Sequence, residues 1–379
     1  MMSLSRILDL SAEKKSILLL GPRQTGKTWL LRHIFPDVPL YNLLHADTFL
    51  RLSTRPQSLR EEYRAGTLIQ PVIVDEIQKL PLLLDEIQAM IDEYGIRFIL
   101  TGSSARRLKR GGVNLLGGRA RVRHLHPLCS REMGTVDLAR VLNFGALPSV
   151  FLSEDPWDDL RAYCGTYLQQ EIADEGVSRR IDAFARFLRI AAIMNGELLN
   201  FEALASDASV PARTVREYYS ILNDTLVGEL VEPWKRGSRR KAISTGRFWF
   251  FDIGVRNALA GDRNIVQGSD RWGRNLEHYV YTELRAYLDY TKDDRQLTFW
   301  RTTGGREVDF IIGDEVAVEV KATESPGDRH ITGLLAIAEE APFRRRILAC
   351  QTLRQSVING VEIMPVDIFT TQLWEGMIV

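Results

Sequence analysis

Eight residues near the N-terminus, GPRQTGKT, have the residue types and spacing of a loop that binds phosphate groups. They match the pattern G-x-x-x-x-G-K-[ST] at each required position. Gly21 and Gly26 permit a tight turn and a close approach of the backbone to phosphate. Lys27 is expected to reach the β- and γ-phosphates, and the hydroxyl of Thr28 to ligate Mg²⁺. The pattern predicts ATP and Mg²⁺ as cofactors, and the predicted nucleotide-binding residues are Gly21, Pro22, Arg23, Gln24, Thr25, Gly26, Lys27 and Thr28.

The flanking segments supply the context that this loop requires. SILLL (Ser16–Leu20) is typical of a short buried strand, and WLLRHIF (Trp29–Phe35) of the start of a helix. A strand, a glycine-rich turn and a helix in this order direct backbone N–H groups and a helix N-terminus at an anion. A chance loop of glycine and lysine is the alternative, and it would not need these flanks.

A second motif predicts hydrolysis as well as binding. PVIVDEIQK (Pro71–Lys79) is an apolar run that ends in two carboxylates, as a central parallel strand does. Asp75 can hold Mg²⁺ through water, and Glu76 points the other way and can polarise a water toward the γ-phosphate. The alternative is a buried strand that happens to end in acidic loop residues.

A third predicted strand, IRFILTGSS (Ile96–Ser104), ends in hydroxyl side chains, of which Ser103 is a candidate to sense the γ-phosphate or to position water. The next segment, Ala105–His124, contains seven Lys or Arg and no Asp or Glu. A guanidinium from it can neutralise transition-state charge in its own subunit or in a neighbour's site. Arg119 and Arg121 are the candidates, and a solvated basic loop is the alternative.

A second candidate site lies in the last hundred residues, on a predicted helix and a predicted hairpin. The hairpin, Arg306–Thr323, alternates in polarity, so its charged side chains share one face. Two of its carboxylates and one helix glutamate can gather one or two Mg²⁺, while a lysine orients an attacking water. The predicted metal ligands are Glu277, Asp309 and Glu319, and the predicted second-site catalytic residue is Lys321. The alternative is a hairpin whose outer face carries ordinary charges.

The middle of the chain has the pattern of a winged helix. Two helical segments, Asp182–Gly196 and Asn200–Val210, precede a longer amphipathic helix that opens at Pro211, and Asn200 is a predicted N-cap. A hairpin with a basic tip follows. Phosphate contacts are predicted for Arg213, Arg216, Arg236, Arg239, Arg240 and Lys241. Many winged helices serve instead as packing modules between proteins or domains, and that alternative stays open.

The bulk composition excludes some classes of protein. Charged residues make up 26% of the 379 and balance to zero, while Ala105–His124 and Lys235–Arg247 are locally basic. The three cysteines have no paired spacing, which argues against a disulfide framework or a structural zinc site and fits a reducing cytoplasm. No apolar run approaches the roughly 20 residues that span a bilayer, so no membrane association is expected. The first sixteen residues are typical of a short amphipathic helix.

The predicted fold class is α/β: a parallel P-loop sheet with helices on both faces, a winged-helix module, and a small α/β nuclease-like domain. The predicted domains are residues 1–135 for the ATPase core, 136–176 for a helical connector or lid, 177–247 for the winged helix, and 248–379 for the nuclease-like domain.

Several motifs together resemble a family of prokaryotic AAA-type ATPases that carry a C-terminal domain of unknown function. They are GPRQTGKT, VIVDEIQK, ILTGSS, GGRARVRHLHPL, FGALPSV, RFWFFDIGV and EVDFII…AVEVKAT. The resemblance implies an AAA+-like core, in which Asp75 and Glu76 are the Walker B pair, and a terminal fold similar to the PD-(D/E)xK nucleases. The proline-aspartate that opens the nuclease motif reads Val308-Asp309 here. Relatives in this class often form rings, so a homo-oligomer is expected.

Two functions of different classes follow. The first is a cytoplasmic ATPase that couples ATP hydrolysis to DNA binding or remodelling, with metal-dependent DNA cleavage as an additional activity. The second is a nucleotide-state switch that acts on a protein partner without processing DNA. DNA-dependent ATP turnover discriminates between them.

Overall fold

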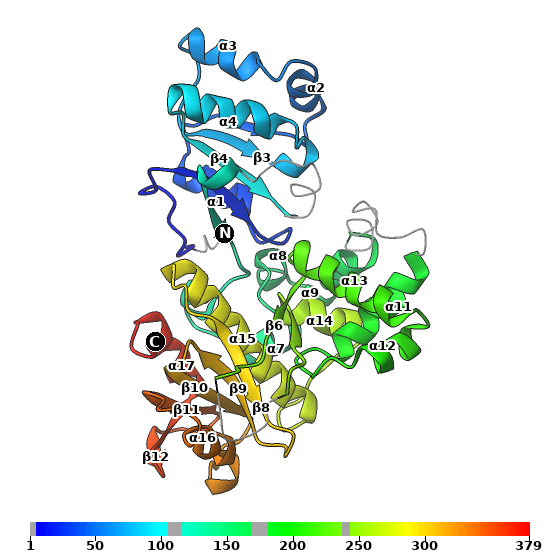
Figure 1. Cartoon of the computed structure of the whole chain (residues 1–379), viewed down its shortest axis with the longest axis vertical. Coiled ribbons are helices and arrows are strands. Elements are labelled where there is room, and N and C mark those ends of the chain that lie inside the picture. The colour runs from blue at the N-terminus through cyan, green and yellow to red at the C-terminus, as the bar shows by residue number, and fades with distance from the viewer. Residues whose placement is uncertain (1–4, 105–115, 168–180, 237–242) are drawn as a thin grey trace.

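The computed structural model describes residues 5–104, 116–167, 181–236 and 243–379. Figure 1 shows three parts: a sheet with helices that begins the chain, a largely helical middle region, and a second sheet at the C-terminal end. The first sheet has five parallel strands. Their spatial order is β2 (Leu40–Asn42), β3 (Val72–Asp75), β4 (Phe98–Gly102), β1 (Ser16–Leu20) and β5 (Ala120–His124).

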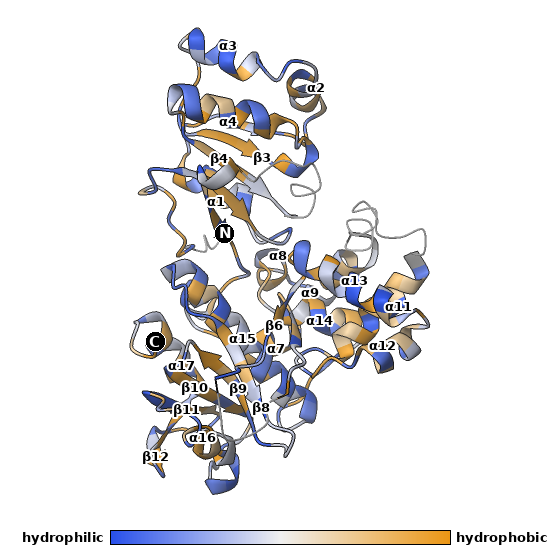
Figure 2. Cartoon of the chain, viewed as in Figure 1, coloured by the Kyte–Doolittle hydropathy of each residue, from blue (hydrophilic) through white to orange (hydrophobic). Residues whose placement is uncertain are grey.

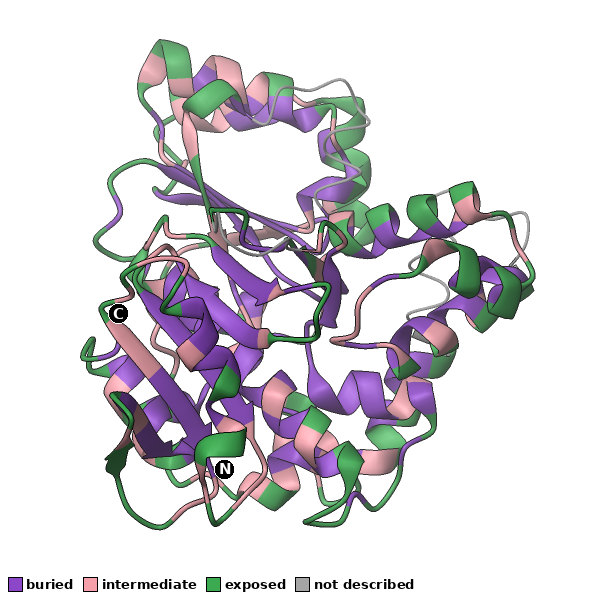
Figure 3. Cartoon of the chain, turned by 60° about the horizontal axis from the view of Figure 1, so that its bottom comes forward, coloured by how far each residue is buried: buried purple, intermediate pink, exposed green. Residues whose placement is uncertain are grey.

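Helices cover both faces of this sheet because its central strands are apolar on both sides. In β1, Leu18 and Leu20 belong to one hydrophobic core, whereas Ile17 and Leu19 point the opposite way and belong to another. Figure 2 shows these hydrophobic strands between amphipathic helices, and Figure 3 shows that the strands are buried. The helices around the sheet are α1 (Lys27–Ile34), α2 (Ala46–Thr54), α3 (Ser58–Arg64) and α4 (Leu83–Tyr94).

The middle region consists mainly of helices and contains one hairpin. Its helices include α6 (Ser130–Met133), α7 (Leu138–Phe144), α8 (Pro148–Phe151), α9 (Pro156–Ala162), α11 (Ile181–Ile193), α12 (Phe201–Ala208), α13 (Ala212–Asp224) and α14 (Ile253–Ala260). The hairpin pairs β6 (Gly228–Val231) with β7 (Arg247–Phe250) in antiparallel fashion. Helices α11 to α13 and the hairpin follow in the order predicted for a winged helix. Asn200 accepts a hydrogen bond from the Ala203 N–H at 3.1 Å, which confirms it as the N-cap of α12.

The C-terminal part is a mixed sheet between helices. It begins with the long helix α15 (Asp270–Thr291), and its sheet has the spatial order β12 (Ser356–Ile358), β13 (Val361–Pro365), β11 (Arg345–Cys350), β10 (Val316–Lys321), β9 (Glu307–Ile312) and β8 (Leu297–Arg301). One face packs on α15 and α17 (Val366–Trp374), and the other packs on α16 (Thr332–Ile337). The predicted hairpin of two strands is β9 and β10, which pair antiparallel.

The fold class predicted from the sequence is confirmed for the parallel sheet with helices on both faces and for the separate mixed-sheet domain that follows. The likeness of that domain to nucleases stays a prediction. The predicted N-terminal helix is wrong for the described residues 5–15, which form turns and irregular backbone. The predicted domain boundary at 247 falls inside β7, so the hairpin continues past it.

Two further observations concern the whole chain. In the parts that the structure describes, no helix combines the length and the apolar character needed to cross a membrane. Cys129, Cys164 and Cys350 are free and buried. The cytoplasmic location stays a prediction.

Candidate nucleotide site and neighbouring clusters

The predicted phosphate loop runs from β1 to α1 at the carboxyl edge of the parallel sheet. A side chain at Gly21 would place its Cβ 2.4 Å from the carbonyl oxygen of Leu125, so only glycine fits there. Gly26 has a φ of 93°, in the left-handed region that favours glycine. Helix α1 begins at Lys27, so the loop leads directly into a helix N-terminus, which favours an anion.

Lys27 is folded back onto its own loop. Its ammonium donates to the carbonyl oxygens of Gly21 at 2.8 Å and Pro22 at 3.0 Å, and the residue is 5% exposed. Burying an ammonium is unfavourable unless acceptors surround it. A bound triphosphate would replace these carbonyls with charged oxygens, which form stronger hydrogen bonds with the ammonium.

Thr28 and Asp75 meet across the sheet edge. The Thr28 hydroxyl donates to one carboxylate oxygen of Asp75 at 2.8 Å, and the Thr101 hydroxyl donates to the other. Asp75 is 1% exposed. Hydroxyl and carboxylate oxygens are the ligands that Mg²⁺ prefers, so this pair fits the predicted ion.

Glu76 follows β3 directly, in a left-handed conformation with φ 62°. Its N–H donates to the Thr101 hydroxyl at 3.0 Å. The side-chain amide of Gln78 donates both to the Glu76 carboxylate and to the hydroxyl of Ser103, the latter at 3.1 Å. Gln78 is therefore a site residue that the sequence prediction missed. The feature of the sequence that could have identified Gln78 is its position two residues after Glu76, inside the acidic motif.

The remaining loop residues are held by neighbours. The Thr25 hydroxyl donates to the carbonyl oxygen of Pro22 at 2.8 Å. The hydroxyl of Ser149 in α8 donates to the side chain of Gln24 at 3.0 Å. The middle region thus touches the loop directly, and Arg23 beside it is half-buried.

The two candidate arginines, Arg119 just before β5 and Arg121 within it, do not lie near this loop in their own chain. Strand β5 runs parallel to β1, with Ala120 opposite Ser16 and His124 opposite Leu20, so residues 119 and 121 lie at the far end of the strand. Arg119 pairs with Asp92 at 2.5 Å and Arg121 pairs with Glu13 at 2.6 Å. Action of either arginine at a neighbouring subunit stays a prediction.

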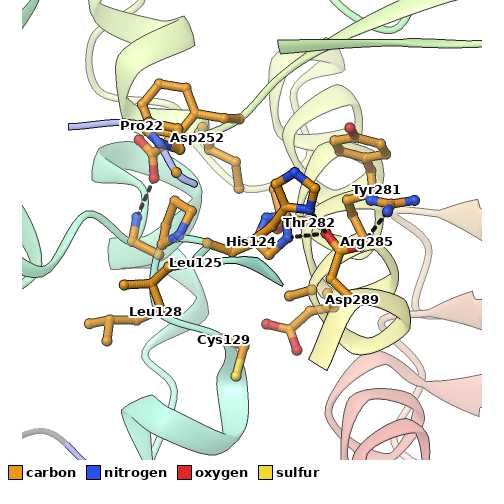
Figure 4. A pocket seen from close by; sticks show the side chains of 18 of the residues that line it. Pro22, His124, Leu125, Leu128, Cys129, Asp252, Tyr281, Thr282, Arg285 and Asp289 are labelled. Carbon is orange, nitrogen blue, oxygen red and sulfur yellow. Dashed lines mark hydrogen bonds and ion pairs between the residues drawn. The ribbon is translucent and has the colours of Figure 1, made fainter. Parts of the chain in front are cut away.

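A cavity of about 220 Å³ opens beside the phosphate loop (Figure 4). Gly21 and Pro22 form part of its wall, followed by the connector that leaves β5. Helix α15 forms the opposite wall with Tyr281, Arg285 and Asp289. Apolar side chains from the connector and the middle region complete the wall, including Leu128, Val141, Ala146 and Ile253.

The charged groups on the α15 wall are paired with one another. Asp289 contacts His126 at 2.5 Å and Arg285 at 2.5 Å, and it lies 3.7 Å from His124. Arg285 also lies 3.6 Å from Glu229 of β6. These ion pairs offset part of the cost of burying charged groups beside the cavity.

Glu283, on the same wall, gives a pH-dependent contribution to stability. It accepts hydrogen bonds from the N–H and hydroxyl of Ser130 and from the indole of Trp374, each at 2.7 Å. Burial nevertheless raises the pKa of Glu283 to about 7, so the folded protein holds a proton that the unfolded chain releases near its ordinary value of 4.5. The resulting stabilisation is full below that value and is lost as the pH rises to about 7.

We therefore expect the stability of the wild type, relative to Glu283→Gln, to fall between pH 5 and pH 7 by up to about 1.4 kcal/mol per pH unit. Denaturant unfolding of both proteins at each pH measures this difference, and the comparison cancels the contribution of the histidines. A difference that is constant across this range would contradict the assignment.

The four predicted residues of the C-terminal domain do meet, around Arg247 of β7. The ammonium of Lys321 lies 2.6 Å from Glu319 and 3.6 Å from Asp309. The guanidinium of Arg247 lies 3.4 Å from Glu277 and 3.8 Å from Asp309. Arg247 comes from the hairpin of the middle region, so this cluster joins the two parts of the chain.

In this arrangement the carboxylates do not fit a metal ion, because two cations already pair with them. Among the residues placed in the structure, no three His, Cys, Asp or Glu side chains are grouped to hold one. Burial and the charge of Asp309 raise the pKa of Glu277 to about 8 and that of Glu319 well above its ordinary value. The roles of Glu277, Asp309 and Glu319 as metal ligands, and of Lys321 in catalysis, stay predictions that this geometry does not favour.

Helix α13 presents two of the predicted nucleic-acid contacts. Arg213 and Arg216 are exposed, and the guanidinium of Arg216 lies over the ring of Phe201 at 4.0 Å. Arg236 instead pairs with Asp314 of the C-terminal domain. The other predicted contacts, Arg239, Arg240 and Lys241, lie outside the described residues.

The chain is similar to known proteins in each of its three parts. Residues 13–134 match a family model described as an AAA domain, while residues 135–265 and 272–369 match two domains of unknown function, DUF8612 and DUF4143. Uncharacterized proteins of Mycobacterium bovis and Mycobacterium tuberculosis are each 27% identical over 324 residues, which cover 82% of this chain and 71% of theirs.

Similar solved structures include the ORC1 protein of Aeropyrum pernix in complex with DNA. It is 15% identical, with a TM-score of 0.26 over 65% of this chain and 87% of that one. A signal transduction ATPase with a tetratricopeptide repeat sensor from Pyrococcus horikoshii is 16% identical, with a TM-score of 0.21 over 73% and 45%. These scores are too low to bear on function. The family match and the geometry of Lys27, Thr28 and Asp75 agree, and the chain carries a P-loop ATPase domain of the AAA type.

Proposed function

We propose that this protein couples ATP hydrolysis to the binding or remodelling of DNA. The DNA part of the proposal rests on one observation: α13 buries one face in the core of the middle region and presents Arg213 and Arg216 on its exposed face. A helix of this kind supplies cationic contacts to the phosphate backbone of DNA.

The loop residues have defined roles in ATP hydrolysis. Lys27 turns from the carbonyls of its own loop to the β- and γ-phosphates. Glu76 polarises the attacking water, and Gln78 holds the Glu76 carboxylate in place. Mg²⁺, held by Thr28 and Asp75, would neutralise charge on the β- and γ-phosphates.

The order of the strands supports a position for the nucleoside in the cavity beside the loop. Asp75 is the last residue of β3 and Thr101 lies near the end of β4, and both strands are on one side of β1. The cavity lies on the other side of β1, at β5. A triphosphate with its γ-phosphate next to Asp75 would therefore extend over Gly21 and Pro22. Its nucleoside would then lie against the apolar wall of the cavity.

The α13 arginines give the sharpest test of DNA coupling. We expect DNA to stimulate ATP turnover in a salt-dependent manner, and the double variant Arg213→Ala/Arg216→Ala to bind DNA about tenfold more weakly, with a salt slope reduced by about 2. Turnover is measured with single-stranded, duplex and four-way-junction DNA at two salt concentrations. Arg55→Ala is the matched control, because its exposed arginine lies in the ATPase domain and pairs with Glu61. Equal losses in the control and the double variant would exclude α13 as the contact surface.

A specific observation supports the second candidate, a nucleotide-state switch that acts on a protein partner. Both described arginines that flank the hairpin tip are engaged inside the chain: Arg236 pairs with Asp314, and Arg247 enters the C-terminal cluster. The hairpin is thus a packing element between domains. Two results together would favour the switch: ATP turnover that no form of DNA changes, and recovery of a stable protein partner by a chain that does not itself bind DNA.

DNA cleavage is not part of this proposal. Cutting in Mg²⁺ or Mn²⁺ that disappears in Asp309→Ala, with ATP turnover intact, would establish it. Homo-oligomer formation stays an expectation, and light scattering with and without ATP measures it.

A further inference from the structure

Arg6 lies in the N-terminal segment, outside the sequence motifs, and its side chain is 3% exposed. Its guanidinium reaches four acceptors. Nε donates to the Glu132 carboxylate at 2.9 Å, and Nη1 donates to the carbonyl oxygen of Thr25 at 2.7 Å. Nη2 donates to the carbonyl oxygen of His126 at 2.6 Å and to the hydroxyl of Tyr290 at 2.9 Å. One side chain therefore joins the phosphate loop, the connector after β5 and helix α15.

The contact with Thr25 controls the orientation of a peptide in the phosphate loop. The carbonyl of Thr25 and the N–H of Gly26 belong to one planar trans peptide, so they point in opposite directions. A guanidinium that holds the carbonyl on one side keeps the Gly26 N–H on the other. The approach is close, since a Cβ on Gly26 would lie 3.8 Å from Nη1 of Arg6.

Tyr290 connects this contact to the C-terminal domain. Its hydroxyl accepts from Arg6 and also from the N–H of His126 at 3.1 Å, and its ring packs against Trp374 of α17 with centroids 6.1 Å apart. A second link runs in parallel, because Lys292, just after α15, pairs with Glu13 of the N-terminal segment at 2.7 Å. The end of α15 is thus tied to the segment that supports the phosphate loop.

We propose that Arg6 is a positioning residue for the nucleotide site and that Tyr290 makes the shape of the phosphate loop depend on the packing of α15. The proposal rests on the proposed nucleotide binding at Gly21–Thr28. Arg6 orients the Gly26 N–H toward phosphate without touching the nucleotide itself. A change in the C-terminal domain therefore alters ATP affinity, and by linkage ATP binding stabilises the contact between Arg6 and Tyr290.

Tyr290→Phe is the test, because it removes one hydroxyl in the C-terminal domain and leaves the ring. The variant removes the acceptor of both Arg6 and the His126 N–H. We expect ATP to bind about fivefold more weakly, the effect of losing the bond to Arg6, with kcat within about twofold of the wild type. Arg6→Lys keeps the charge but cannot reach all four acceptors, so we expect a larger rise in KM. Tyr287→Phe is the matched control, since it makes the same change on α15, and its ring also packs on Trp374, with centroids 5.6 Å apart.

A second readout separates this inference from the proposed function. Amide hydrogen exchange of the 379-residue chain without nucleotide should be faster at Gly26 in Tyr290→Phe than in the wild type or in Tyr287→Phe. If the wild type failed to bind ATP, the proposed function would be wrong, while this exchange difference would still show that the contact between Arg6 and Tyr290 fixes the shape of the loop. ATP affinity and Gly26 exchange that are unchanged in Tyr290→Phe, or changed equally in Tyr287→Phe, would overturn it.

Discussion

Replacing Lys27 with alanine should lower ATP turnover by at least about 100-fold, because it removes a preorganised cation from charge that develops in the transition state. In the structure, the Lys27 ammonium is buried between the carbonyl oxygens of Gly21 and Pro22. In the nucleotide complex, charged phosphate oxygens would replace these neutral acceptors of the ammonium. Alanine has no side-chain group that can bind the phosphates, so nucleotide affinity should fall together with turnover.

Steady-state phosphate release and nucleotide titration measure the two effects of Lys27→Ala. Lys15→Ala is the matched control, because Lys15 is an exposed lysine just before β1, at the end of the strand away from the loop. We expect the control to keep both activities. Turnover in Lys27→Ala within tenfold of the wild type would mean that this loop is not the site of hydrolysis.

Replacing Arg247 with alanine should destabilise the protein by about 3–5 kcal/mol, the cost of removing one partner from a buried ion pair. The Arg247 side chain is 5% exposed and pairs with Glu277, Glu307 and Asp309. It also lies over the ring of Phe299 at 4.6 Å. Although burial lowers the pKa of Arg247, the charges of Glu277 and Asp309 hold it above its ordinary value, so the guanidinium remains a cation. Denaturant unfolding at pH 7 measures the loss.

Two further variants test whether this loss of stability comes from the charge of Arg247. Arg301→Ala removes a half-exposed arginine that lies 3.3 Å from the same Glu307, and we expect it to cost at most about 1 kcal/mol. Adding Asp309→Asn to Arg247→Ala should restore part of the stability, because it removes the charge of a buried carboxylate that has lost one of its two cations. If Arg247→Ala costs no more than Arg301→Ala, the cluster does not depend on its central cation.

The nucleotide site was largely predictable from the sequence because its parts are local. A strand, a turn and a helix at Ser16–Phe35 place glycines, lysine and threonine without help from distant residues. Asp75 was predictable because parallel strands bring their carboxyl ends to one edge of a sheet, where the structure places it 2.8 Å from Thr28. The same reasoning predicted Glu76 and Ser103, and the structure adds Gln78 between them.

The acidic cluster was predictable only in part. The alternation of the Arg306–Thr323 hairpin correctly places Asp309, Glu319 and Lys321 together. It cannot show that a cation from another part of the chain enters among them, because Arg247 is 62 residues before Asp309 in the printed sequence. The structure shows these carboxylates paired with arginine and lysine, and the metal site stays a prediction.

The sequence by itself determined the ATPase core, since the chemistry of phosphate binding needs a few residue types at short spacing. Only the tertiary structure decided which long cationic side chains lie beside this loop in the same chain. It places Arg119 and Arg121 at the far end of β5, and it brings Arg6 to the carbonyl of Thr25 and the hydroxyl of Tyr290. The physical reason is the length of the arginine side chain. Its guanidinium lies several ångströms from its own backbone and contacts elements that are distant in the sequence and that only folding brings together.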